Sequence, residues 1–432
     1  MDATTQRHPP ARHVFAVITG NALEFYDFTC YSYFASQIGA AFFPSKSPIV
    51  SLLASLAAFG IGFLGRPVGG ILIGAYGDRR GRRPAMLLSF ALMGVAILAF
   101  VFLPPFSAIG IAAPIAVVAI RFVQGIAVGG DVGPTTAFLL EVAPARRRGL
   151  YTALQYSSQG GATLLAGVAG YTLSQIFDAK GLEDYGWRIA FAIGAVILPF
   201  AALMRRSLPE THEAGTRQGP LLLAPRHWRT VALGFLMLGS TTVGFYIIAY
   251  LTTYAQRFLG MKANVSFAAT LVFGIANMIF STLAGHLSDR FGRKKLMVIP
   301  RALFALAILP AFWLIVRERS ALTLLGAAFV LGALGQMAVT GFVALSEALP
   351  KEVRSASLAT IYATAISLFG GTAQFAVTWL IGATGDIMMP AYYLLAATLI
   401  GLVAMALMDE TAPAIVEERQ WTQGPPVGRE LI

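Results

Sequence analysis

The chain has 432 residues, of which 56% are hydrophobic and 12% charged, about half of the roughly 25% charge of soluble domains. This excludes a soluble globular protein, and the single cysteine, Cys30, excludes a disulfide-rich one. The net charge of +11 does not indicate nucleic acid as a partner, because Lys and Arg occur in short clusters between long apolar runs, as on the inner side of a membrane protein.

Twelve stretches of the chain are long and apolar enough to cross a bilayer, which takes about 20 residues in a helix. They cover 14–40, 49–76, 84–103, 111–141, 149–177, 187–204, 229–256, 264–288, 296–316, 320–347, 355–383 and 390–408. No cleavable signal peptide is expected, because residues 1–13 are polar and the first span carries two acids. The sequence therefore predicts an all-α membrane protein with twelve transmembrane helices.

Basic residues predict the orientation of these spans. The loops after even-numbered spans carry clusters at 79–83, 146–148, 205–229, 290–295 and 351–354, whereas the other loops have few Lys and Arg. Because basic loops stay on the inner side, we expect both termini in the cytoplasm. The polar stretch 205–228 then divides the chain into an N-terminal bundle (1–204) and a C-terminal bundle with a short tail (229–432), joined by a cytoplasmic connector.

The two predicted bundles repeat one another. Gly74–Arg83 reads GAYGDRRGRR and Gly285–Lys294 reads GHLSDRFGRK, an offset of 211 residues, and each follows the second span of its half. Two further landmarks recur at offsets of 206 and 210, namely Glu141 with Glu347 and the Gly-Gly pairs at 160 and 370. We therefore expect two pseudo-symmetric bundles of six helices.

Span 1 places polar and charged residues inside the membrane. Asn21, Glu24, Asp27, Phe28 and Tyr31 fall on one face of a helix. Charges at this depth are costly and should face a partner or a water-filled cavity. Burial disfavours a charged carboxyl group and a nearby cation favours it, so such an acid can take up or release a proton as a cation is withdrawn or offered.

Span 4 offers that cation. Arg121 shares a helix face with Gln124 and Asp131, and its guanidinium provides a forked donor for carboxylates. We expect Arg121 to alternate between Asp27, or Glu24, and a substrate carboxylate, so that protonation of the acid frees the cation for the substrate. Asp131 is a further candidate for proton coupling, and the alternative for the whole group is a permanent structural ion pair.

Two other arginines lie within predicted spans. Arg66 precedes Pro67 in span 2, and we favour a structural role in which it holds neighbouring backbone carbonyls over one as a substrate ligand. Arg301 lies about six residues into span 9, and we expect its side chain to snorkel to the cytoplasmic surface.

The second half has almost no charge at its centre. Its polar candidates for substrate binding are Tyr246, Tyr250, Gln336 and Gln374, opposite Gln155, Ser158 and Gln159 of span 5. From the first half we also expect substrate contacts at Asn21, Tyr31, Arg121 and Gln124. Neutral amides and hydroxyls can orient a polyhydroxy or multi-carboxylate anion, although such residues also form hydrogen bonds between membrane helices.

The sequence resembles the major facilitator superfamily in its two DR-x-GR loops and in Arg121–Gly125, which reads RFVQG. Within it, GNALEFYDF (20–28), GRPVGG (65–70) and RFVQGIAVGGDVG (121–133) resemble the metabolite:proton symporters, although that family usually has Glu at position 131. The phrases FFP (42–44), ETHE (210–213) and SDRFGR (288–293) look most like its citrate and tricarballylate symporters. The resemblance implies two bundles that rock about a central site, and it supports the pairing of a first-helix acid with Arg121.

The same resemblance implies a cytoplasmic gate. Its candidate residues are Asp78, Arg82, Glu141, Asp289, Arg293 and Glu347. We expect Asp78 and Asp289 to meet the positive start of a helix in the opposite half, near Ser355 and Gly149 respectively. The alternative is a pair of basic turns that only set topology.

These observations predict a proton symporter of a di- or tricarboxylate such as citrate, in a bacterial inner membrane. Alternatives are a symporter of a betaine-like zwitterion or a shikimate-like acid, and a membrane sensor that does not transport. The chain contains no GxxxxGK[ST], HExxH, CxxC or GxSxG motif, so we expect no enzyme, no metal and no cofactor other than the coupling proton. The expected partners are the small anion, protons and the lipid bilayer, with the chain acting as a monomer.

Overall fold

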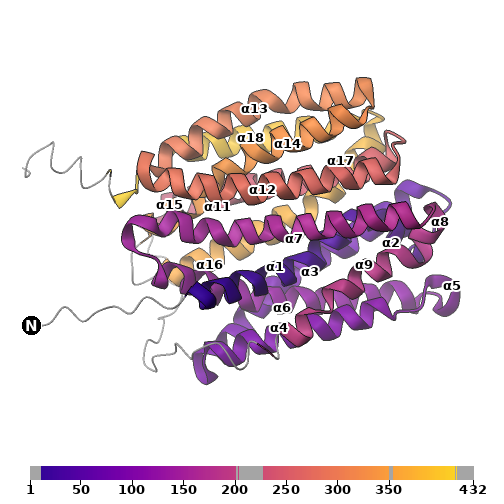
Figure 1. The fold of residues 1–432 in the computed structure, drawn as a ribbon, viewed down its shortest axis with the longest axis horizontal. Coiled ribbons are helices and arrows are strands. Elements are labelled where there is room, and N and C mark those ends of the chain that lie inside the picture. The colour runs from indigo at the N-terminus through magenta and orange to yellow at the C-terminus, as the bar shows by residue number, and fades with distance from the viewer. Residues whose placement is uncertain (1–10, 201–202, 204–226, 350–353, 414, 416–432) are drawn as a thin grey trace, which may run out of the picture.

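The computed structural model describes residues 11–200, 203, 227–349, 354–413 and 415, and the regular structure of these residues is entirely helical (Figure 1). The predicted connector 205–228 lies almost wholly outside this range. Most helices follow the predicted spans, because each long apolar run must satisfy its backbone hydrogen bonds internally in lipid. The sixth predicted span, 187–204, departs from this: it is helical over 187–194 and 197–200, with a turn at 195–196.

The first six predicted spans form these helices: α1 (Ala11–Tyr33) with the short α2 (Ala35–Phe42), α3 (Pro48–Arg80), α4 (Arg82–Val101), α6 (Ala112–Val142), α7 (Arg148–Ile176) and α9 (Trp187–Gly194). Two short helices, α5 (Phe106–Ile109) and α8 (Ala179–Gly181), lie in the connections at one end.

The second six spans form α11 (Trp228–Arg257), α12 (Ala263–Phe291), α13 (Arg293–Glu318), α14 (Ala321–Met337) with α15 (Gly341–Ala348), α16 (Arg354–Ala365) with α17 (Gly371–Thr384), and α18 (Met389–Leu407). A 3₁₀ turn (Ala338–Thr340) interrupts the tenth span, and a π-helical segment (Ile366–Gly370) interrupts the eleventh. The sequence predicts both spans as continuous helices, and the structure corrects this.

The DR-x-GR repeat has the same backbone geometry in both halves. Gly81 ends α3 with a φ of 106°, and Gly292 ends α12 with a φ of 96°. This left-handed region favours glycine, and the next residue in each case starts a new helix. The repeated glycines therefore make the sharp reversal between consecutive membrane helices.

The halves meet mainly along α7 and α12, which run side by side through the middle of the molecule, and along α3 and α17 (Figure 1). Small residues permit these contacts. A Cβ atom on Gly160 of α7 would lie 2.5 Å from the backbone nitrogen of Met278, and one on Gly371 of α17 would lie 3.0 Å from the carbonyl oxygen of Gly60.

The distribution of side chains is that of a membrane protein. Nine helical segments in the described part of the chain are long and apolar enough to cross a bilayer, and large apolar side chains such as Ile71, Val95 and Leu306 are exposed. By contrast, Glu24, Asp27 and other polar side chains are buried. Helices α1 and α7 are absent from the nine segments, because polar residues make their sequences less apolar. Much of this polar sequence faces the interior.

Candidate functional site

An ion pair joins α1 to α6 inside the first half. Arg121 Nη1 lies 2.9 Å from Asp27 Oδ2, and neither side chain is exposed. Gln124 completes a triangle, since its Nε2 donates to Asp27 Oδ1 at 3.0 Å and its Oε1 accepts from Arg121 Nη1 at 2.6 Å. The structure thus brings three predicted residues together; their part in transport stays a prediction.

Aromatic rings surround the Arg121 guanidinium. Its central carbon lies 4.4 Å from the ring centre of Tyr31, 4.6 Å from that of Phe28 and 5.7 Å from that of Phe59. The Tyr31 hydroxyl donates to the Ser55 carbonyl at 3.1 Å, so its ring, rather than its hydroxyl, faces the cation. Arg121 Nε and Nη2 make no hydrogen bond to the described residues, which leaves donors for an anion.

The other predicted residues of α1 and α7 form a brace between these helices. Asn21 Nδ2 donates to Ser158 Oγ at 2.7 Å and to the Gln155 carbonyl at 3.3 Å. Glu24 is fully buried on the same helix as Asp27. The side chain of Asp131, the remaining proton-coupling candidate, lies outside the part of the chain that is described.

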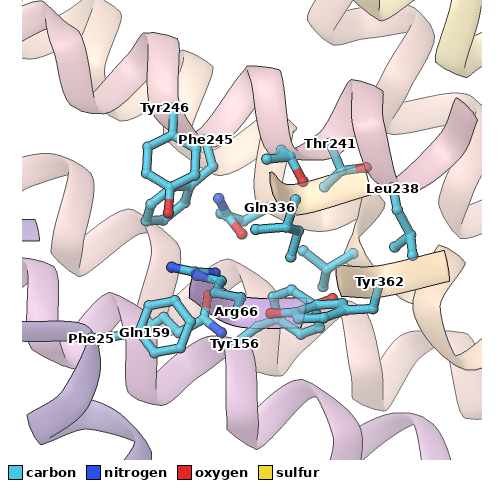
Figure 2. Close-up of a pocket in the computed structure, with 13 residues that line it drawn as sticks. Phe25, Arg66, Tyr156, Gln159, Leu238, Thr241, Phe245, Tyr246, Gln336 and Tyr362 are labelled. Atoms are coloured by element: carbon cyan, nitrogen blue, oxygen red, sulfur yellow. The ribbon is translucent and has the colours of Figure 1, made fainter. Parts of the chain in front are cut away.

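A cavity of about 50 Å³ lies between the two halves (Figure 2). It has room for a few water molecules but is far smaller than the 300–1,000 Å³ of typical ligand sites, so the site must widen to admit a metabolite. Its described lining consists of Phe25, Arg66, Tyr156, Gln159, Leu238, Thr241, Thr242, Phe245, Tyr246, Gln336, Val339, Tyr362 and Ile366.

Three predicted substrate ligands, Gln159, Tyr246 and Gln336, belong to this lining. Arg121 and Gln124 are not among the described lining residues; the ring of Phe28 contacts the guanidinium groups of both Arg121 and the cavity-lining Arg66, at 4.6 Å from each. The predicted ion pair therefore lies just behind the cavity wall.

Tyr250 and Gln374 have other partners. The Tyr250 hydroxyl lies 2.6 Å from Thr378 Oγ1, which joins α11 to α17. Gln374 Nε2 donates to Ser32 Oγ at 2.6 Å and to the Tyr246 carbonyl at 3.0 Å. In this conformation Gln374 links α17 to α1, and it holds the two halves together beside the cavity.

Arg66 is placed differently from our prediction. None of its three guanidinium nitrogens makes a hydrogen bond to the described chain, so the interpretation that it holds backbone carbonyls is wrong. It lies instead over the rings of Phe63, at 4.2 Å, and Phe28, at 4.6 Å, and it lines the cavity. Sequence reasoning missed this because a helix position alone does not show which neighbour it faces.

The predicted snorkelling of Arg301 is also wrong. Its side chain is 1% exposed and donates to the carbonyl oxygen of Ser240 at 2.8 Å as well as to the Ser240 hydroxyl. These bonds, both from Arg301 Nη2, attach α13 to α11. A partner within the bundle thus holds the guanidinium without the side chain reaching the surface.

The DR-x-GR loop of the second half forms a latch, which we define as Asp289, Arg293 and Glu347. Asp289 accepts from the backbone nitrogens of Gly149 and Leu150 at 2.9 and 3.0 Å, at the positive start of α7. Arg293 pairs with Asp289 at 2.7 Å and with Glu347 at 3.1 Å. The predicted contact between Asp289 and the helix start at Gly149 is confirmed. The side chains of Asp78, Arg82, Glu141 and Ser355 lie outside the described residues.

A residue that sequence reasoning missed supports this latch. Glu410, just after α18, accepts from the backbone nitrogens of Arg293 and Lys294 at 2.8 and 3.1 Å, and Thr411 Oγ1 donates to Glu347 at 2.9 Å. The acid thereby caps α13 at its positive end. The available signal was a pair of acidic residues, Asp409 and Glu410, directly after the last predicted span.

The helical membrane bundle, its internal repeat and its central cavity define a transporter, and comparison with known sequences identifies its family. Residues 17–278 and 262–430 each match the Major Facilitator Superfamily. The chain belongs to this superfamily, and it is a transporter rather than an enzyme.

Individual relatives cover nearly the whole chain. It is 34% identical to the citrate-proton symporter of Klebsiella pneumoniae, over 90% of each chain. It is 32% identical to the proline/betaine transporter of Salmonella typhimurium, over 92% of this chain and 83% of that one. The xylose transporter XylE from E. coli, in a partially occluded inward-open conformation, has the same fold, with a TM-score of 0.76, 20% identity, and coverage of 92% of this chain and 98% of that one.

Proposed function

We propose that the protein carries a di- or tricarboxylate of the citrate type together with protons, by alternating access. The observation that carries this proposal is the buried pair of Asp27 and Arg121, in which the cation keeps two donors without partners in the described chain. Removing one partner of a buried ion pair costs about 3–5 kcal/mol, so Arg121 favours an anion at every stage of the cycle.

Proton coupling follows from competition for this one cation. When Asp27 takes up a proton, it loses the charge that holds Arg121, and Gln124, which bonds to both groups, can keep the neutral acid in place. A substrate carboxylate can then replace Asp27 as the partner of Arg121. Release of the proton restores the internal pair and expels the substrate, which links the two movements.

The cavity wall formed by the second half can bind the polar groups of the substrate other than the carboxylate that pairs with Arg121. Gln336, Thr242 and Tyr246 line the cavity, and each offers a neutral hydrogen-bonding group. Figure 2 shows Gln336 and Tyr246 across the gap from Arg66. The name of the Klebsiella relative, a citrate-proton symporter at 34% identity, supports a substrate of this kind.

A betaine-like zwitterion is the second candidate, because the cavity is rich in aromatic rings. Phe25, Tyr156, Phe245, Tyr246 and Tyr362 line it, and aromatic rings bind quaternary ammonium groups. A proline/betaine transporter is also among the relatives. Against this candidate, Arg66 lies over the lining ring of Phe25, and both Arg66 and Arg121 lie over the neighbouring ring of Phe28. These two cations repel a positively charged ligand.

The latch belongs to the same cycle. Asp289 joins the second half to the start of α7 in the first, so this contact must break when the cavity opens at that end. From the basic loops we propose that this end is cytoplasmic, with both termini there, in a bacterial inner membrane. We further propose bundles at 1–204 and 229–432, a connector at 205–228, and a functional monomer without a cofactor.

Uptake into proteoliposomes tests the substrate and its coupling together. The purified chain is reconstituted, an inwardly directed proton gradient is imposed by a pH jump, and labelled citrate or glycine betaine is supplied. We expect accumulation of citrate that collapses when the gradient is dissipated. Accumulation of betaine alone, or citrate entry that does not respond to the gradient, would refute the proposal.

A further inference from the structure

Arg66 lies in the cavity between the halves as a buried cation without a bonded anion. It is 3% exposed, and its guanidinium nitrogens have no hydrogen-bonded acid among the described residues. Its charge interacts with the neutral Tyr246 hydroxyl across the cavity. Figure 2 shows the guanidinium reaching into the space between the walls, with Gln159 beside it and Gln336 and Tyr246 across the gap. A charge at this depth calls for a partner, and the cavity is the place from which one can come.

The position of Arg66 is held by its backbone rather than by bonds of its side chain. A Cβ atom on Gly129 of α6 would lie 2.6 Å from Arg66 Cα, so only the absence of a side chain there lets α6 approach α3 at this point. The rings of Phe63 and Phe28, both in the first half, lie under the guanidinium. Their π faces attract the cation. The group is therefore positioned in advance of a ligand.

The relation of Arg66 to Arg121 indicates the kind of ligand. Both guanidinium groups lie 4.6 Å from the ring centre of Phe28, but Asp27 pairs with Arg121 whereas Arg66 has no hydrogen-bonded acid among the described residues. One substrate carboxylate that replaces Asp27 leaves Arg66 unmatched. A substrate with a second carboxylate matches both cations.

We propose that Arg66 binds a second carboxylate of the substrate and so makes the transporter select di- and tricarboxylates over ligands with a single carboxylate. Gln336 and Tyr246 complete the subsite from the opposite wall. This inference rests on the proposed function, because it assigns a second contact to the same carboxylate substrate.

Binding to the purified full-length protein tests the inference. The affinities for citrate and for a citrate dimethyl ester, which keeps one carboxylate, are measured by calorimetry for the wild type, Arg66→Gln and Arg66→Lys. Arg301→Gln is the matched control, because Arg301 is also a buried arginine of a membrane helix but is bonded to Ser240, and neither residue belongs to the described cavity lining.

We expect the wild type to prefer citrate over the ester by about tenfold or more, as a charge-assisted forked contact provides. In Arg66→Gln the preference falls to about twofold or less, while the affinity for the ester changes little; Arg301→Gln keeps the wild-type preference. Lysine keeps the charge but not the fork, so Arg66→Lys retains an intermediate preference.

Several outcomes overturn the inference. One is a preference for citrate over the ester in Arg66→Gln that equals the wild-type preference. Another is an equal loss of affinity for both ligands in this variant, which indicates a structural role for Arg66. If the glutamine variant does not fold, an unchanged preference in Arg66→Lys overturns it instead. Failure of the proposed function is distinct, since the wild type itself then binds neither citrate nor its ester.

Discussion

The two halves repeat one fold but divide the chemistry unequally. The first half buries Asp27, Arg66 and Arg121 at or behind the cavity wall, whereas the second half contributes the neutral Gln336, Thr242 and Tyr246. The buried cations of the second half, Arg293 and Arg301, are bonded within the latch or to Ser240. One wall therefore carries buried charges whose guanidinium donors are partly without hydrogen-bond partners among the described residues, and the other carries neutral hydrogen-bonding groups.

The halves agree where the backbone requires it. Gly81 and Gly292 both have a positive φ at the same point of the DR-x-GR repeat, because only glycine reverses the chain there at low cost. Repeated backbone geometry and divergent interior charge thus coexist. Substitutions in one half at a time test which half carries each function.

The largest effect is expected for Asp27→Asn in the first half. A gradient of about two pH units supports up to about 100-fold accumulation per coupled proton, and this accumulation should vanish because asparagine cannot carry a proton. Exchange of internal for external citrate should continue, since Arg121 is then open to substrate. Glu24→Gln, on the same helix, is the control. If accumulation survives in Asp27→Asn and is lost in Glu24→Gln, the coupling acid is Glu24.

The next effect is expected at the latch, through Asp289→Ala. This substitution removes a charged acceptor for two backbone N–H groups and for Arg293. Because each charged hydrogen bond contributes about 1.5–3 kcal/mol, the fraction of molecules with the latch end open should rise about tenfold or more. The labelling rate of a cysteine at position 241, in the cavity lining, measures this in a Cys30→Ser background. Glu318→Ala, at an exposed ion pair, should leave the rate unchanged; equal rates in the two variants contradict a latch.

A smaller effect is expected for Gln336→Ala in the neutral wall. The loss of one neutral hydrogen bond should weaken citrate binding by about fivefold, and proton-driven accumulation should persist because no charge is removed. Calorimetry and uptake measure the two effects separately, with the apolar change Val339→Ala in the same lining as control. Loss of accumulation in Gln336→Ala would show that the second half takes part in proton coupling.

The smallest effect on transport is expected for Arg301→Gln. Removal of the bonds to Ser240 should lower stability by about 1–3 kcal/mol, visible as a lower melting temperature in detergent. Citrate affinity should stay within about twofold, because charge-assisted bonds act only over contact distances. A larger loss of affinity at an unchanged melting temperature would place a substrate contact in the second half after all.

Much of this arrangement follows from the sequence. The twelve spans, the repeat and the partnership of Asp27 with Arg121 could be predicted, because few residues have the charge and the position to pair inside a membrane. The contact of Asp289 with the start of α7 could be predicted from helix polarity. Residues with neutral side chains were harder to place: Gln159 and Gln336 line the cavity, whereas Gln374 bonds to Ser32.

What the sequence determined by itself is the membrane fold and the set of groups that need partners inside it, since both follow from hydrophobicity and from the cost of buried charge. Tertiary structure alone decided which partner each group found: Asp27 for Arg121, Ser240 for Arg301 and the cavity for Arg66. The rotation and crossing of packed helices set these choices, and they depend on distant small residues such as Gly129 that no local pattern relates to the charges they position.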